Sequence, residues 1–311
     1  MRANLRRVLT RTASLLAPLL LLIGCVTAAP DLERDVDRVL SANRGRSIAV
    51  AYYDLRDGTS LLRNERERFH AASTMKVPVM LGIYEAVSRG ELRLDQKVRV
   101  RNEFVSILDG STYSLEARED SDPKLYEQIG QDLALEELVR RMIVRSSNLS
   151  TNIVIELIGA KRVMDLMKQI GANDIQVLRG VEDDKAYHAG MNNTTTAYDM
   201  MLIFRALGEN RIINDQASRN MIAILAGQEH TDGIPAGLPP GTRVANKTGS
   251  ITKIAHDAAL IMTPDGGSYA LVVLTRGFKK GKDAQKAIAA ISRAVWRAKG
   301  IAPDGESASR R

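Results

Sequence analysis

A serine and a lysine three positions apart stand at the start of an apolar stretch of the chain. In Ser73-Thr74-Met75-Lys76 the two side chains would lie one helical turn apart, on the same face of a helix. The lysine amine would then be placed to take the proton of the serine hydroxyl. This pair predicts nucleophilic acyl-transfer chemistry at Ser73, with Lys76 as a base.

The Ser-x-x-Lys pattern is not specific by itself, because it occurs three times, at Ser73, Ser121 and Ser250. Ser121 lies in an acidic segment that is interrupted by Pro123, which predicts an exposed loop. Ser250 follows Lys-Thr-Gly, a pattern typical of a strand end. Only Ser73 precedes a run that is apolar on nearly every side, which predicts a buried helix that holds the serine in a dry pocket.

Two later clusters carry the other groups that a serine acyltransferase needs. The cluster Ser146-Ser147-Asn148 offers hydroxyls and an amide, and Lys247-Thr248-Gly249-Ser250 offers a second cation. Both are far from Ser73 in the sequence. We expect all three clusters to meet in a crevice between two parts of the fold, a common place for such sites.

The elements that position the clusters follow from apolar spacing and turn signals. Helical spacing or a helix cap predicts helices over 31–42, 133–144, 149–158, 163–170, about 197–207, 217–225 and 283–299. Alternation and turn residues predict strands over 47–55, 60–63, 242–247, 256–263 and 268–275. The helical block therefore lies between strands that come from both ends of the chain.

This order predicts an α+β fold: an antiparallel sheet flanked by N- and C-terminal helices, with an inserted all-helical lobe. We expect one domain over 31–300. Its sheet lobe comprises 31–70 and 241–300, and its helical lobe 71–240. A flexible tail is expected over 301–311, where glycine, serine and arginine dominate.

The first 24 residues have the composition of a signal peptide. They contain four arginines and no acidic residue, and they end in an apolar run of about ten residues, too short to span a bilayer as a permanent helix. Cys25 comes next, after Leu22-Ile23-Gly24, which looks like a bacterial lipobox. The sequence therefore predicts a lipoprotein with its lipid anchor at Cys25 and a tether over 25–30.

Ordinary cleavage near Ala28 or Ala29 is the alternative to lipidation. Lipidation and ordinary cleavage both predict an exported, periplasmic protein. Its only attachment to the membrane would be the lipid anchor at Cys25. In an organism with two membranes, Val26 after the cysteine favours the outer one.

Composition excludes several other classes of protein. The formal charge of +7 falls to +3 without the four arginines of the leader, so we expect no nucleic-acid partner. The four histidines show no metal-ligand spacing and the chain has one cysteine, so neither a metal site nor a disulfide is expected. We expect no cofactor and a monomer, and we interpret His256 as a packing residue.

The three clusters, in this order and widely spaced, resemble the serine beta-lactamase and penicillin-binding-protein superfamily, above all its class A beta-lactamases. The resemblance covers about residues 31–300. Asn152 and the threonines of 194–196 also look like class A.

The resemblance implies a role for each matched residue. Ser73 would be the nucleophile, and Lys76 a base whose pKa is lowered by desolvation and by the cation of Lys247. Ser146 would relay a proton to the leaving nitrogen, and Asn148 would hold the substrate amide.

The remaining matched residues would bind the substrate. Lys247 and Thr248 would hold its carboxylate, and Gly249 would leave room for an extended chain. The backbone N–H groups of Ser73 and Ser250 would form the oxyanion hole.

The chain also departs from the class A pattern. Ser147 stands where class A usually has an aspartate of mainly structural role, and 101–131 looks like an insertion near the site entrance. Glu182 is the best match for the glutamate that holds the deacylating water, but Ala186 stands where its asparagine partner is expected. Without a well-placed base, the acyl-enzyme would be long-lived.

The sequence therefore predicts a serine beta-lactamase that opens the lactam ring through an acyl-enzyme on Ser73. The first alternative is a D,D-peptidase that acts on peptidoglycan peptides and is trapped by penicillins. The second is a non-catalytic lipoprotein that binds beta-lactams or peptidoglycan. In all three readings the ligand is a small beta-lactam or peptide.

Overall fold

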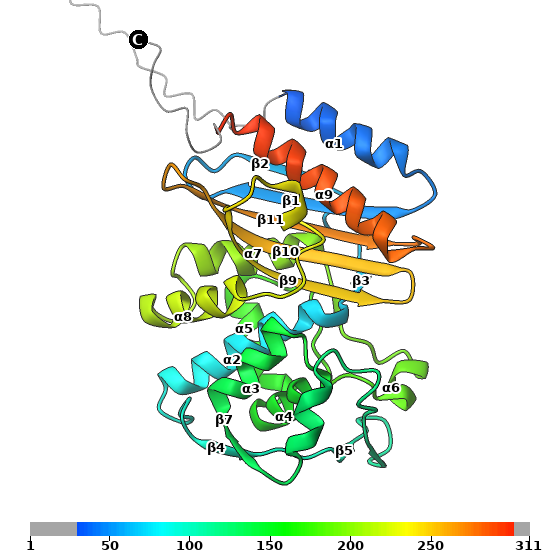
Figure 1. Cartoon of the computed structure of the whole chain (residues 1–311), viewed down its shortest axis with the longest axis vertical. Helices are drawn as coiled ribbons and strands as arrows, with labels where there is room; N and C mark the ends of the chain where they lie inside the picture. The colour runs from blue at the N-terminus through cyan, green and yellow to red at the C-terminus, as the bar shows by residue number, and fades with distance from the viewer. Residues whose placement is uncertain (1–29, 302–311) are drawn as a thin grey trace, which may run out of the picture.

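A computed structural model describes residues 30–301 of the chain (Figure 1). The predicted leader, Cys25 and most of the predicted tether and tail lie outside the described residues. The centre of the fold is a five-stranded antiparallel sheet in the order β2-β1-β11-β10-β9. Its strands are β1 (Ser47–Asp54), β2 (Ser60–Arg63), β9 (Arg243–Ile251), β10 (Ile254–Met262) and β11 (Ser268–Arg276).

Helices α1 (Pro30–Ala42) and α9 (Gly281–Ala298) pack together over one face of this sheet (Figure 1). The alternation of β1 explains why both of its faces are buried. Ile48, Val50 and Tyr52 join the core beneath these two helices, whereas Ala49 and Ala51 join the core on the opposite face. The sheet is therefore covered on both sides.

The rest of the chain between the strands is mainly helical. Its helices are α2 (Lys76–Ser88), α3 (Leu135–Val144), α4 (Asn148–Ile158), α5 (Ala160–Ile170), α6 (Asp184–His188), α7 (Ala197–Gly208) and α8 (Asp215–Ala226). Three 3-10 turns are η1 (Ala72–Met75), η2 (Pro123–Gln128) and η3 (Pro235–Gly237). Short paired strands are β3 (Phe69–His70) with β8 (Thr194–Thr195), β4 (Lys97–Arg99) with β7 (Asp132–Ala134), and β5 (Phe104–Val105) with β6 (Thr112–Tyr113).

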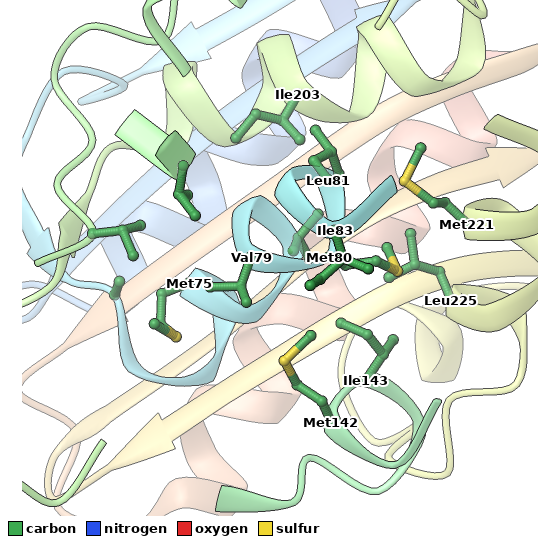
Figure 2. Packing of buried hydrophobic residues seen from close by; sticks show 14 of the residues in the cluster. Met75, Val79, Met80, Leu81, Ile83, Met142, Ile143, Ile203, Met221 and Leu225 are labelled. Atoms are coloured by element: carbon green, nitrogen blue, oxygen red, sulfur yellow. The ribbon is translucent and has the colours of Figure 1, made fainter. Parts of the chain in front are cut away.

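Helix α2 is buried on almost every side, as its apolar sequence predicts. Figure 2 shows side chains of α2 packed against side chains of α3, α7 and α8. The buried residues labelled there are Val79, Met80, Leu81 and Ile83 of α2, Met75 just before it, Met142 and Ile143 of α3, Ile203 of α7, and Met221 and Leu225 of α8. Pro78 lies in the first turn of α2, where a missing N–H costs no hydrogen bond of the helix. The helix that follows Ser73 is thus fixed by the core.

The predicted fold class is confirmed: the chain is an α+β protein with an antiparallel sheet between terminal helices. The predicted helices and strands are present, most with boundaries within about two residues, and Thr196 caps α7 by accepting from the N–H of Asp199. Helix α7 packs on the sheet itself, against β1 and β11. The boundaries assigned to the two lobes stay a prediction. Within residues 30–301, no helix is long and apolar enough to cross a membrane.

Two expectations about local structure are wrong. Strand β9 does not end at Lys247 but continues through Lys-Thr-Gly to Ile251, because β10 pairs with it along this whole length. The segment around Ser121 is not simply an exposed loop. Ser121 is exposed, but Asp120 and Asp122 on either side are buried and hydrogen-bonded.

Candidate active site

Ser73 lies in the tight turn η1, directly before α2. The residue before it, Ala72, has a φ of 46°, in the left-handed region that side chains other than glycine rarely adopt. The N–H of Ala72 donates to Nδ1 of His70 at 3.0 Å, and Oγ1 of Thr74 donates to the Ala71 carbonyl at 2.6 Å. These contacts hold the strained turn, so the backbone of the half-buried Ser73 has a fixed position.

Lys76 is the first residue of α2 and is fully buried. Its Nζ donates to the Ser146 carbonyl at 2.6 Å, to Oδ1 of Asn148 at 2.8 Å and to Oγ of Ser146 at 3.3 Å. Burial lowers the pKa of Lys76 to about 7. Within residues 30–301, Ser73 is not among the hydrogen-bond partners of this amine. The lysine therefore faces the second cluster, one helical turn from the serine.

Ser146 joins α3 to α4 and is the point where the two lysines meet. Its φ of 62° is also left-handed, and the residue lines the cleft beside Ser73. Nζ of Lys247 donates to Oγ of Ser146 at 3.0 Å, beside the contact from Lys76. The buried Ser147 caps α4 by accepting from the N–H of Ser150 at 3.2 Å, so it has a structural role.

Lys247, Thr248 and Gly249 belong to β9, which runs beside the turn of Ser73. Burial and the nearby charge of Lys76 lower the pKa of Lys247 well below its usual value. A Cβ at Gly249 would lie 3.1 Å from the backbone nitrogens of both Ser73 and Thr74. Only glycine lets the strand approach this turn so closely.

Glu182 lies on the other side of the cleft, in the loop between α5 and α7. Its Oε1 accepts from Nδ2 of Asn148 at 2.6 Å, while Oδ1 of the same amide accepts from Lys76. Asn148 thus bridges the predicted base of acylation and the predicted base of deacylation. Burial raises the pKa of Glu182 above that of a free glutamate. Ala186 is buried and provides no side-chain contact to the carboxylate.

Two adjoining cavities open around Ser73, of about 340 and 390 Å³. Both are lined by Ser73, Asn148, Ser250 and Glu119. The first also contains Ser146, Thr248 and Gly249, and the second also contains Glu182. The three clusters and Glu182 therefore border one continuous cleft.

Three side chains that support the cleft were given no role from the sequence, although Asn152 was noted as a class A-like residue. Both carboxylate oxygens of Asp120 accept from the N–H of Asn148, and one also accepts from Leu149 at 2.8 Å, at the positive end of α4. The side-chain amide of Asn152 bonds both backbone polar groups of Val181, beside Glu182.

His70 is the third supporting residue, and His256 holds it in place. The buried His256 donates from Nε2 to the His70 carbonyl at 2.9 Å and accepts from the N–H of Thr275 at Nδ1. Burial lowers the pKa of His256 to about 4, so the ring is neutral at pH 7. These contacts agree with the prediction that His256 is a packing and hydrogen-bonding residue. In the described part of the chain, no group of three or more histidine, cysteine and acidic side chains is arranged to hold a metal ion.

Comparisons with known proteins show which family the chain is similar to. A model of the Beta-lactamase enzyme family matches residues 31–298. Beta-lactamase VEB-1 of Pseudomonas aeruginosa is 23% identical over 288 residues, which cover 86% of this chain and 89% of that protein.

Solved structures share the fold. The crystal structure of a beta-lactamase from Sphaerobacter thermophilus has a TM-score of 0.73 and 27% identity, covering 88% of this chain and 98% of its own. PBP-A has a TM-score of 0.74 and 22% identity, covering 87% and 96%. A variant of PBP-A was solved as an acyl-enzyme complex with penicillin G. At this identity, the likeness to PBP-A shows the fold alone.

Proposed function

Since the chain belongs to the Beta-lactamase enzyme family, we propose that it is a serine beta-lactamase that opens the lactam ring through an acyl-enzyme on Ser73. The observation that carries the proposal is the convergence of Lys76 and Lys247 on Oγ of Ser146, in the cleft that Ser73 borders. Two buried amines on one hydroxyl form a path for a proton across the site.

In the first step, Oγ of Ser73 attacks the carbonyl carbon of the lactam while neutral Lys76 takes the hydroxyl proton. The pKa of Lys76, lowered to about 7 by burial, leaves about half of this amine free of its proton at neutral pH. The C–N bond then breaks, Ser146 donates its hydroxyl proton to the leaving nitrogen, and protonated Lys76 passes its proton to Ser146. The product is an ester of Ser73 with the opened ring.

In the second step, water adds to the ester carbon and the carboxylate of Glu182 takes the water proton. The bond from carbon to Oγ of Ser73 breaks, and this oxygen recovers the proton that Glu182 took from the water, which returns both residues to their starting states. The net reaction consumes one water and cleaves one amide. Asn148 bonds both Lys76 and Glu182, and would keep the two bases apart and hold each in position.

Substrate binding would use the sheet side of the cleft. Lys247 and Thr248 supply a cation and a hydroxyl for the substrate carboxylate. The backbone N–H groups of Ser73 and Ser250 would stabilise the oxyanion. The contact of Gly249 with the Ser73 turn supports this arrangement, because it places β9 beside the nucleophile.

A D,D-peptidase is the second candidate, and one observation favours it. Within residues 30–301, Asn148 is the one hydrogen-bond partner of the Glu182 carboxylate, since Ala186 offers none. A base held by a single contact would release the acyl group slowly, and a beta-lactam would then trap the enzyme.

The test is to incubate the purified protein with a chromogenic cephalosporin and to follow absorbance and intact protein mass together. Sustained turnover supports the beta-lactamase, and a one-to-one adduct without turnover supports the peptidase. Ser73→Ala should remove both turnover and adduct. The matched control is Ser88→Ala, which removes the hydroxyl of an exposed serine at the end of α2 that bonds the Glu85 carbonyl, and which should keep them. A covalent adduct that persists in Ser73→Ala would refute the proposal.

We also propose that the protein is exported and lipid-anchored at Cys25, on the support of the leader sequence alone. The protein should fractionate with membranes, and Cys25→Ala should release it to the soluble periplasmic fraction. An unchanged distribution of that variant would contradict lipidation.

A further inference from the structure

The hairpin of β5 and β6 lies against the loop that carries Glu182. Its strands pair Phe104 with Tyr113 and Val105 with Thr112, and in Figure 1 β5 and α6 lie on the same side of the molecule. The base of the hairpin is closed by Asn102, whose side chain bonds both the N–H and the carbonyl of Leu115. The hairpin therefore has a defined shape of its own.

The tip of the hairpin hydrogen-bonds Asp183, the residue after Glu182. Asp183 is 2% exposed, and its two oxygens accept from Oγ of Ser106 at 2.8 Å and from the N–H of Ile107 at 3.0 Å. The same carboxylate caps α6 by accepting from the N–H of Ala186 at 3.1 Å. Asp183 is thus shared between the hairpin and the loop.

The residue before Glu182 is also held. Asn152 accepts from the N–H of Val181 at 2.6 Å and donates to its carbonyl at 3.0 Å. The Tyr113 hydroxyl, on β6, lies 3.4 Å from the same carbonyl and 3.3 Å from Nδ2 of Asn152. Both neighbours of Glu182 therefore contact the hairpin directly.

Glu182 itself has a φ of 59°, a strained conformation for a residue with a side chain. Such a conformation persists only where the surroundings enforce it. The apolar side chains near the hairpin tip point outward, with Val105, Ile107 and Leu108 between 40% and 56% exposed. The hairpin therefore contacts the Glu182 loop mainly through hydrogen bonds, and the bond between Ser106 and Asp183 is buried.

We infer that the 104–113 hairpin is a latch that fixes Glu182 for release of the acyl group, with Ser106 and Tyr113 as positioning residues. The inference rests on the proposed function, because it assigns release to Glu182. The latch holds the loop of Glu182, whose carboxylate is bonded by the Asn148 side chain and by no second side chain of residues 30–301. Acylation, which uses Ser73, Lys76 and Ser146, does not depend on it.

The test compares Ser106→Ala with Ser114→Ala. Both remove one hydroxyl from the same segment, but Oγ of Ser114 bonds the Asn102 carbonyl within that segment and does not reach the loop. In Ser106→Ala, release should slow about tenfold, as expected for a buried hydrogen bond to a charged group, while the acylation rate stays within about twofold. Ser114→Ala should keep both rates. Tyr113→Phe gives a second, smaller perturbation of the latch if Ser106→Ala folds poorly.

Hydrogen exchange of the Val181 and Ala186 amides provides a readout that needs no catalysis. Exchange should become faster in Ser106→Ala and not in Ser114→Ala. Equal exchange in the two variants, or a parallel fall of acylation and release, would overturn the latch. If the wild type forms no adduct at all, the proposed function fails, and the exchange data alone decide whether the hairpin holds the loop.

Discussion

The two sides of the cleft around Ser73 are built in different ways. The side that would form the acyl-enzyme stands on α2, on the start of α4 and on β9, which are long elements anchored in the core. The side that would release it stands on a loop with a five-residue helix, held by Asn152 and by a two-stranded hairpin. Bond formation thus rests on hydrophobic packing, and release rests on a few polar contacts.

This difference implies that the two steps respond differently to substitution. A change among the buried elements should lower acylation, and often the stability of the protein with it. A change in the loop or its contacts should lower release alone, because little of the core depends on it. The rate of release is then the easier property to change while the fold is kept.

The largest effect should come from the buried lysine of α2. Lys76→Ala removes the amine that takes the Ser73 proton and should lower the acylation rate by about 10²–10⁴-fold, the usual contribution of a general base. Stopped-flow acylation by a chromogenic cephalosporin measures it. The control is Lys185→Ala, an exposed lysine that bonds Asp109 and Ser111 at the hairpin tip. Acylation at the wild-type rate in Lys76→Ala would remove this residue from the mechanism.

Gly249→Ala should have the next largest effect. Its Cβ would meet the backbone nitrogens of Ser73 and Thr74 at 3.1 Å, and backbone atoms cannot turn aside as a side chain can. We expect a loss of about 1–3 kcal/mol in the free energy of unfolding, together with slower acylation. Thermal unfolding and stopped-flow acylation test the two effects.

Gly281→Ala, at the start of α9, is the control for this substitution because a Cβ there meets nothing within 4 Å. If Gly249→Ala acylates as fast as Gly281→Ala, the close contact between β9 and the nucleophile turn has no role in the reaction.

The pH dependence of acylation should be the next smaller effect. The pKa of Lys76, about 7, means that the amine is protonated below this pH and cannot accept the Ser73 proton. The acylation rate should therefore fall about tenfold per unit below pH 7 and level off above it. Single-turnover rates between pH 5.5 and 8.5 measure it. A flat profile through pH 7 would exclude Lys76 as the titrating base.

The acylating side of the cleft was largely predictable from the sequence. Ser73, Lys76, Ser146 and Lys247 were found because their residue types occur in order beside strongly periodic helices and strands. The structure brings these residues together, although it places the Lys76 amine on Ser146 and Asn148 rather than on Ser73. The spacing of Ser73 and Lys76 predicts that they share one face of the helix, but it does not predict the side-chain rotamer of Lys76.

The supporting contacts were not predictable. Asp120 looked like part of an exposed acidic loop, but the free N–H groups at the start of α4, 28 residues later, draw its carboxylate inward. The left-handed conformations of Ala72, Ser146 and Glu182 occur at residues that give no local signal for them. The β5–β6 hairpin has strands of two residues each, too short for any alternation to be visible.

The central claim is that Glu182 serves release and not attachment. The direct test is Glu182→Gln, measured by intact mass after mixing with a penicillin and again during the following hours. The account predicts an adduct on Ser73 that forms at about the wild-type rate and then persists, with release at least about 10²-fold slower. An adduct that is released as fast as in the wild type, or that fails to form, would contradict the division of the cleft into an acylating side and a releasing side.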